Sequence, residues 1–181
     1  CFLVEKPVGM TLLEIKELIN KVNNNQNLLK VSNIFLFNNY LINFKKILNA
    51  KCTKIKSIKL TWFDKQNEIR NGVLKTYDPT IPIYIDCMHH ITTILSLFVD
   101  TKVLQVKSFN FKKGGSHIQF RLSKKNIDIQ INLARNKKIR IRKLEVMSED
   151  KKNFFINFSN EPGFIKFEGK KVNSDTNWGK S

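Results

Sequence analysis

The segment HIQFRLSKKNIDIQINL, residues 117–133, decides the fold class, because apolar and polar side chains alternate through most of it. The apolar members of this alternation are Ile118, Phe120 and Leu122, followed by Ile127, Ile129, Ile131 and Leu133. A period of two is that of a β-strand with one face on the core. Residues 154–158 alternate in the same way, and the turn signals Gly114-Gly115 and Pro162-Gly163 separate the runs. The second half of the chain therefore predicts an antiparallel sheet.

The first half of the chain predicts helices between strands. Thr11 and Glu14 form a capping box before a run with apolar residues at helical spacing, which predicts a helix as far as Val22. Further along the chain we expect strands at 2–4, 29–37 and 55–63, helices at 41–48 and 83–98, and a long loop at 64–82. Together these elements predict one α+β architecture, a mostly antiparallel open-faced sheet with helices on one face.

Composition excludes several classes of protein. The chain has 181 residues, of which 41% are hydrophobic and 26% charged, so it is not disordered throughout. It contains no window of about 20 apolar residues that could cross a bilayer, and its first residues lack the order of a signal peptide. Three cysteines without metal-ligand spacing do not suggest a disulfide framework. We therefore expect a reducing, cytoplasmic location and no membrane partner.

The formal net charge of +17 invites a polyanion as partner, but the kind of basic residue argues against nucleic acid. Only 5 of the 32 basic residues are arginine, and the lysines are scattered along every segment. Proteins that read bases rely on the bidentate guanidinium and on aromatic rings placed for stacking. We expect a solvated basic surface and no nucleic-acid partner.

Common catalytic motifs are absent from the sequence. The seven glycines form neither G-x-G-x-x-G nor a P-loop, so the chain has no phosphate-binding loop of those kinds. There is no HExxH, and the acidic residues form no clear cluster, so no metal site is expected.

Two short motifs carry chemistry: Glu5-Lys6-Pro7, and Asp86 with His90 one helical turn later. When an alcohol is oxidised, a proton leaves oxygen as hydride leaves carbon, and a histidine is suited to accept that proton. His90 would be this base, Asp86 would orient it or bind a hydroxyl, and Lys6 would stabilise the alkoxide. Each motif alone also fits a structural role, as a solvated charge before a turn or as an ordinary i,i+4 helix pair.

The two motifs in this order resemble the glucose-fructose oxidoreductase and inositol dehydrogenase family, Gfo/Idh/MocA. Residues 40–59 and 144–165 also resemble parts of its second domain, so the resemblance covers nearly the whole chain. The resemblance implies a carboxyl-terminal portion of an NAD- or NADP-dependent oxidoreductase, a fragment with residues 1–27 as the tail of the Rossmann domain. Residues 28–181 would form the substrate-binding and oligomerisation domain, and Glu5, Lys6 and Pro7 would face the cofactor.

The resemblance further implies a sugar, polyol or sugar-nucleotide substrate and a homo-oligomer formed through the open sheet face. His89, Arg70 and Tyr77 are candidate substrate contacts, although His89 fits a core position equally well. Family members commonly carry glycines before the aspartate, where this chain has Pro82-Ile83-Tyr84-Ile85. Two alternatives stay open: a noncatalytic self-association domain and, less favoured, a basic nucleic-acid-binding module.

Overall fold

The computed structural model describes residues 2–5, 8–9, 11–25, 28–70, 72–76, 81–160 and 163–173. Of the candidate site residues, Lys6, Pro7 and Tyr77 lie outside this set, and Arg70 is described by its backbone alone.

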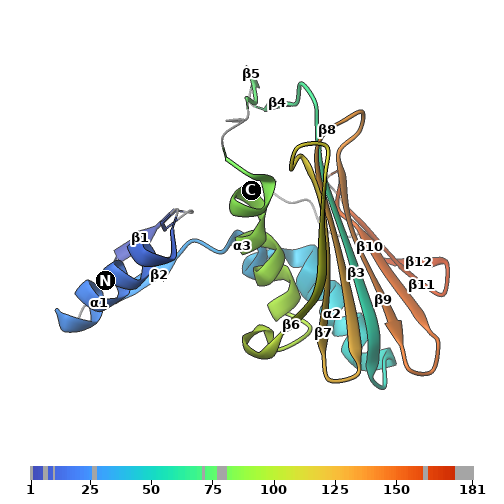
Figure 1. Ribbon diagram of the computed structural model, residues 1–181. Coiled ribbons are helices and arrows are strands. Elements are labelled where there is room, and N and C mark those ends of the chain that lie inside the picture. Colours follow the sequence, from blue (N-terminus) through green and yellow to red (C-terminus); the bar gives the residue numbers. More distant parts are fainter. Residues whose placement is uncertain are drawn as a thin grey trace.

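An eight-stranded sheet forms one side of the molecule (Figure 1), in the order β12-β11-β10-β9-β3-β8-β7-β6. Its strands are β3 (Ile55–Lys65), β6 (Gln105–Lys112), β7 (His117–Lys124), β8 (Ile127–Lys137), β9 (Ile141–Ser148), β10 (Asn153–Asn157), β11 (Phe164–Phe167) and β12 (Lys170–Asn173). All neighbouring strands pair antiparallel except β3 and β8, which are parallel. The mostly antiparallel sheet predicted from the alternating sequence is confirmed.

Two helices, α2 (Asn39–Lys51) and α3 (Ile83–Ser96), cover one face of this sheet (Figure 1). Along β3 the side chains of Ile58 and Leu60 are buried against the helices, whereas Lys59 between them is exposed on the other face. Phe44 of α2 is fully buried in the same core. No helix in the described part of the chain is long and apolar enough to span a bilayer. The α+β class with one open sheet face is thus confirmed.

The first residues form a smaller β-α-β unit that lies beside α3 in Figure 1. Its strands β1 (Phe2–Val4) and β2 (Leu29–Val31) pair parallel, and α1 (Leu12–Asn24) connects them. The capping box predicted at Thr11 is present, because its hydroxyl accepts from the Glu14 amide at 3.2 Å and the Glu14 carboxylate accepts from the Thr11 amide at 3.0 Å. No residue of α1 is buried in the described structure.

Two expected elements differ from the structure. The strand expected at 29–37 ends at Val31 and is followed by a 3-10 helix, η1 (Ile34–Phe37), which turns Phe35 onto Trp62 with ring centroids 5.5 Å apart. The packing of Phe35 against Trp62 outweighs the local preference of residues 32–37 for a strand. The expected loop at 64–82 contains a short hairpin of β4 (Ile69–Arg70) and β5 (Val73–Leu74). Outside this loop, a second 3-10 helix, η2 (Thr101–Val103), follows α3.

We predict that Phe44→Ala lowers the free energy of unfolding by about 3–5 kcal/mol, because it empties a fully buried ring position that also contacts Phe98 at 5.7 Å. Urea unfolding measures the change. The matched control is Phe37→Ala, which removes a ring that is 78% exposed and should cost about 0.5 kcal/mol or less. Equal losses in the two variants would contradict the described core.

Candidate active site

The first turn of α3 holds Asp86 in an ion pair with Arg135 of β8. One guanidinium nitrogen of Arg135 lies 3.2 Å from the Asp86 carboxylate, and the other donates to the Ile81 carbonyl at 2.7 Å. Arg135 is almost buried, and the amino end of a helix favours a negative charge. Asp86 is therefore an oriented carboxylate at the start of α3, tied to the sheet below it.

His90 lies one turn further along α3 and packs against aromatic rings. Its ring centroid is 5.0 Å from that of Phe35, edge on, and 5.7 Å from that of Trp62 with an angle of 23° between the planes. The imidazole is half-buried between α3, η1 and β3. The structure thus gives the candidate base a defined aromatic environment.

His89 lines a cavity of about 740 Å³ between α3 and the β-α-β unit. Val8 and Gly9, which follow directly after Lys6-Pro7, line the same cavity as Met88, His89 and Thr92 of α3. The lining is mainly apolar. Residues next to Glu5-Lys6-Pro7 and residues of α3, the helix that contains Asp86 and His90, therefore line the same cavity. The His89 and His90 rings lie 3.6 Å apart between centroids, so this space and the aromatic environment of His90 are adjacent.

The other candidate residues lie around this region to different extents. Glu5 is described at the end of β1 and is exposed. Arg70 lies on β4 in the small hairpin, and Lys6, Pro7 and Tyr77 lie outside the described residues. Their roles stay predictions.

A buried ion pair between Asp64 of β3 and Arg142 of β9 was missed by the sequence reasoning. The Arg142 guanidinium also donates to the carbonyls of Phe63 at 2.6 Å and Ile141 at 3.0 Å, and its centre lies 3.6 Å from the ring centroid of Trp62. Burial lowers the pKa of Arg142, and the Asp64 carboxylate opposes this effect. One signal in the sequence could have indicated that Arg142 is buried. Side chains alternate between the two faces of a strand, so Arg142 lies on the same face as the buried Leu144 and Val146.

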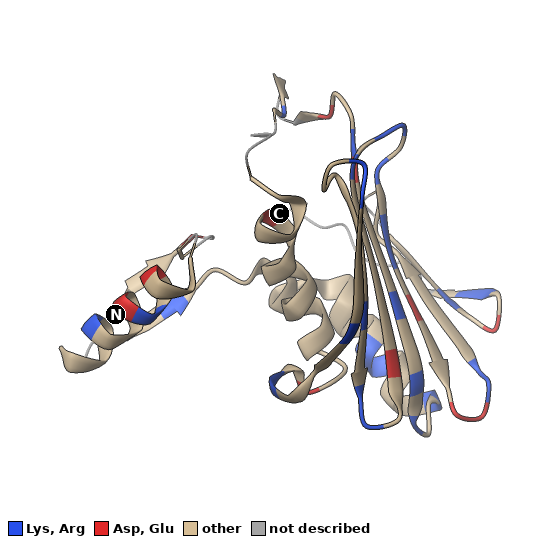
Figure 2. Cartoon of the chain, in the orientation of Figure 1, with Lys and Arg blue, Asp and Glu red and all other residues tan. Residues whose placement is uncertain are grey.

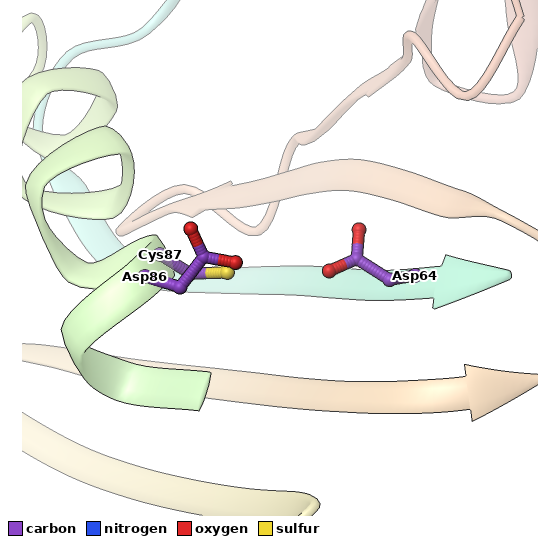
Figure 3. Close-up of side chains that lie close together, drawn as sticks. All are labelled: Asp64, Asp86 and Cys87. Carbon is purple, nitrogen blue, oxygen red and sulfur yellow. The ribbon is translucent and has the colours of Figure 1, made fainter. Parts of the chain in front are cut away.

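Asp64, Asp86 and Cys87 approach one another beneath the start of α3, with their ligand atoms within 4.8 Å (Figure 3). Each carboxylate already pairs with an arginine, and these two guanidiniums disfavour an added cation. Burial, followed by the two carboxylates, raises the pKa of the Cys87 thiol to about 12, so the thiol is protonated at neutral pH. The cluster is best described as two ion pairs around a neutral thiol.

Comparison with known proteins places this arrangement in a known fold. No protein-family model and no curated protein matches the sequence. Solved structures do match. A 3-ketoreductase from Actinomadura kijaniata, in complex with TDP-benzene and NADP, aligns with a TM-score of 0.70 and 12% identity over 94% of this chain and 54% of that one.

Two further structures agree. UDP-N-acetylglucosamine 3-dehydrogenase from Acidithiobacillus ferrooxidans aligns with a TM-score of 0.61 and 13% identity, over 96% of this chain and 56% of that one. A biliverdin reductase from Synechocystis, in complex with biliverdin and NADP+, aligns with a TM-score of 0.67 and 12% identity, over 99% and 58%. The chain therefore shares the fold of part of these oxidoreductases, and the similarity is one of fold. The chain spans about half the length of these oxidoreductases.

We predict that Arg142→Met lowers the free energy of unfolding by about 3–5 kcal/mol, because it leaves the Asp64 carboxylate buried without its counter-charge. Chemical denaturation measures the change. Arg121→Met is the matched control, since it breaks an exposed pair with Asp128 at 2.9 Å and should cost about 1 kcal/mol or less. A loss at Arg142 no larger than that at Arg121 would argue against a buried pair.

Proposed function

We propose that the chain is the substrate-binding part of an NAD(P)-dependent oxidoreductase that interconverts a hydroxyl and a keto group on a sugar, polyol or sugar nucleotide. The observation that carries the proposal is the cavity shared by Val8, Gly9 and His89. Its volume of about 740 Å³ lies within the range of small-molecule sites, about 300–1,000 Å³. Dinucleotide-dependent enzymes of the same fold support the proposal.

Each candidate residue has a separate role in the proposed reaction. When bound, the nicotinamide supplies or accepts the hydride. His90 takes the hydroxyl proton as hydride leaves carbon. Asp86, oriented by Arg135, binds a substrate hydroxyl, and the Lys6 ammonium stabilises negative charge on the reacting oxygen. His89 contacts the substrate from the cavity wall, and Arg70 and Tyr77 contribute from the segment before α3.

Cofactor binding is divided between this chain and further polypeptide. The sequence has no G-x-G-x-x-G loop for the pyrophosphate, so Glu5, Lys6 and Pro7 meet only the reactive end of NAD or NADP. Residues 1–27 then form the last part of a nucleotide-binding domain, and residues 28–181 the substrate domain. Support for a nucleotide-binding tail comes from the parallel pairing of β1 with β2, because parallel β-α-β units build such domains; this pairing extends the unit past residue 27 to Val31.

The substrate class follows from the polar groups rather than from the fold. The carboxylate of Asp86 accepts hydrogen bonds, and a neutral imidazole at His89 can accept one and donate one, which together suit the vicinal hydroxyls of a sugar or polyol. The dehydrogenase that acts on UDP-N-acetylglucosamine supports this reading. The biliverdin reductase of the same fold is the reason that the fold alone does not define a substrate.

Self-association through the open sheet face is the second candidate function. A chain of net charge +17 repels its own copy, but two basic residues on this face are each paired with an acidic residue. Lys59 lies 3.7 Å from Glu145, and Arg121 lies 2.9 Å from Asp128. These two pairs lower the electrostatic cost of bringing two such faces together, which favours a homo-oligomer.

The proposal includes no nucleic-acid partner and a cytoplasmic setting. Lysines and arginines are distributed over both ends of the sheet and over the smaller unit (Figure 2). Cys52 and Cys87 are both free thiols, which suits a reducing compartment.

The proposed function is tested by measuring NAD(H) and NADP(H) binding by calorimetry for this chain and for the product of the whole reading frame around it. We expect binding only by the longer product. Oxidation of a panel of sugars and polyols, followed by NAD(P)H absorbance, then identifies the substrate. His90→Gln and Lys6→Ala should each lower kcat by about 10²–10⁴-fold.

His117→Gln is the matched control, because His117 lies on β7 and is hydrogen-bonded to Asn132 at 2.7 Å on the open face. It should leave kcat unchanged. Absence of dinucleotide binding in both proteins, together with a stable dimer in sedimentation, would favour the self-association domain and contradict the enzyme.

A further inference from the structure

We propose that Trp62, stacked with the buried guanidinium of Arg142, is a positioning residue that fixes the plane of the His90 imidazole. The proposal rests on the proposed function only in treating His90 as the base. The contacts themselves connect a buried ion pair in the sheet to the candidate base on α3 through a single aromatic ring.

The first contact lies within the sheet. Trp62 of β3 and Arg142 of β9 are direct cross-strand partners, and both side chains are buried on the face that the helices cover. The guanidinium carbon lies 3.6 Å from the centroid of the Trp62 ring. This distance is that of a close cation–π stack, which is strongest when the cation is removed from water.

The guanidinium cannot move away from the ring without losing several hydrogen bonds. It donates to the Phe63 and Ile141 carbonyls and to the Asp64 carboxylate. The Arg142 side chain is only 2% exposed, so water cannot replace these partners. Arg142 is therefore a rigid planar surface beside Trp62.

The indole is oriented by packing alone. Among the described residues its ring nitrogen has no hydrogen-bond partner, although it is buried. Phe35 and Phe158 contact the ring edge on, with centroids at 5.5 and 6.5 Å. The stack with Arg142 and these two edge contacts together define the plane of Trp62.

His90 lies against this oriented ring. Its plane is within 23° of the Trp62 plane, and Phe35 contacts both rings. Rotation of the imidazole about its Cβ–Cγ bond would break the near-parallel stack, so Trp62 restricts the directions in which the ring nitrogens point. A base must meet its proton at hydrogen-bond distance, and a misplacement of about 1 Å can cost about 10²-fold in rate.

The stack is tested first by NMR on the 181-residue chain, which contains only three histidines. Single substitutions assign the ring protons of His89, His90 and His117. We expect nuclear Overhauser contacts between the Trp62 indole and the His90 imidazole, and a ring-current shift of the His90 protons that Trp62→Leu removes and Trp62→Phe partly keeps. His117, on the opposite sheet face, should not shift.

If Trp62→Leu does not fold, the contacts between the two rings in the unsubstituted protein decide the matter. Absence of these contacts would overturn the proposal, as would His90 shifts that stay the same in a folded Trp62→Leu variant.

The functional consequence is tested in the product of the whole reading frame. Trp62→Leu should lower kcat by about 10–10²-fold with little change in KM, and Trp62→Phe should restore most of the loss. An unchanged kcat in Trp62→Leu would overturn the positioning role. The proposed function fails separately: if His90→Gln leaves turnover unchanged while the NMR stack is present, the base assignment is wrong and the stack is structural.

Discussion

The parallel pairing of β3 with β8, in a sheet that is otherwise antiparallel, is the constraint on which the rest of the structure depends. Parallel neighbours cannot be joined by a tight turn, so the chain must cross one face of the sheet between them. That crossing contains α3, which brings its first turn to the end of β3, where Asp64 lies close to Asp86 and Cys87 (Figure 3). The candidate site is a consequence of this connection.

Buried charge links the core to the site at two places. Arg135 of β8 holds Asp86 and the Ile81 carbonyl, and Arg142 of β9 holds Asp64 beside Trp62. Buried ion pairs contribute little net stability, because desolvation offsets much of the attraction. Their effect here is geometric: both arginines come from the rigid sheet, and both constrain groups at or beneath α3. A loop-borne site would lack this support.

The elements that were predictable are those whose apolar period is unambiguous. The alternation at 117–133 predicts β7 and β8, and the apolar spacing at 83–98 predicts α3. The strand expected at 29–37 was wrong beyond Val31, since Phe35 is drawn into contact with Trp62 by tertiary packing. The Asp64–Arg142 pair joins residues 78 positions apart, so the alternation along β9 indicates that Arg142 is buried but does not identify Asp64 as its partner. The catalytic roles of Lys6, Asp86 and His90 remain predictions.

The most direct measurement is a crystal structure of the product of the whole reading frame with NADP bound. We predict that the nicotinamide end of NADP binds at the cavity that Gly9 and His89 line. A nicotinamide bound away from this cavity, or a cavity filled by the protein's own side chains, would contradict the account.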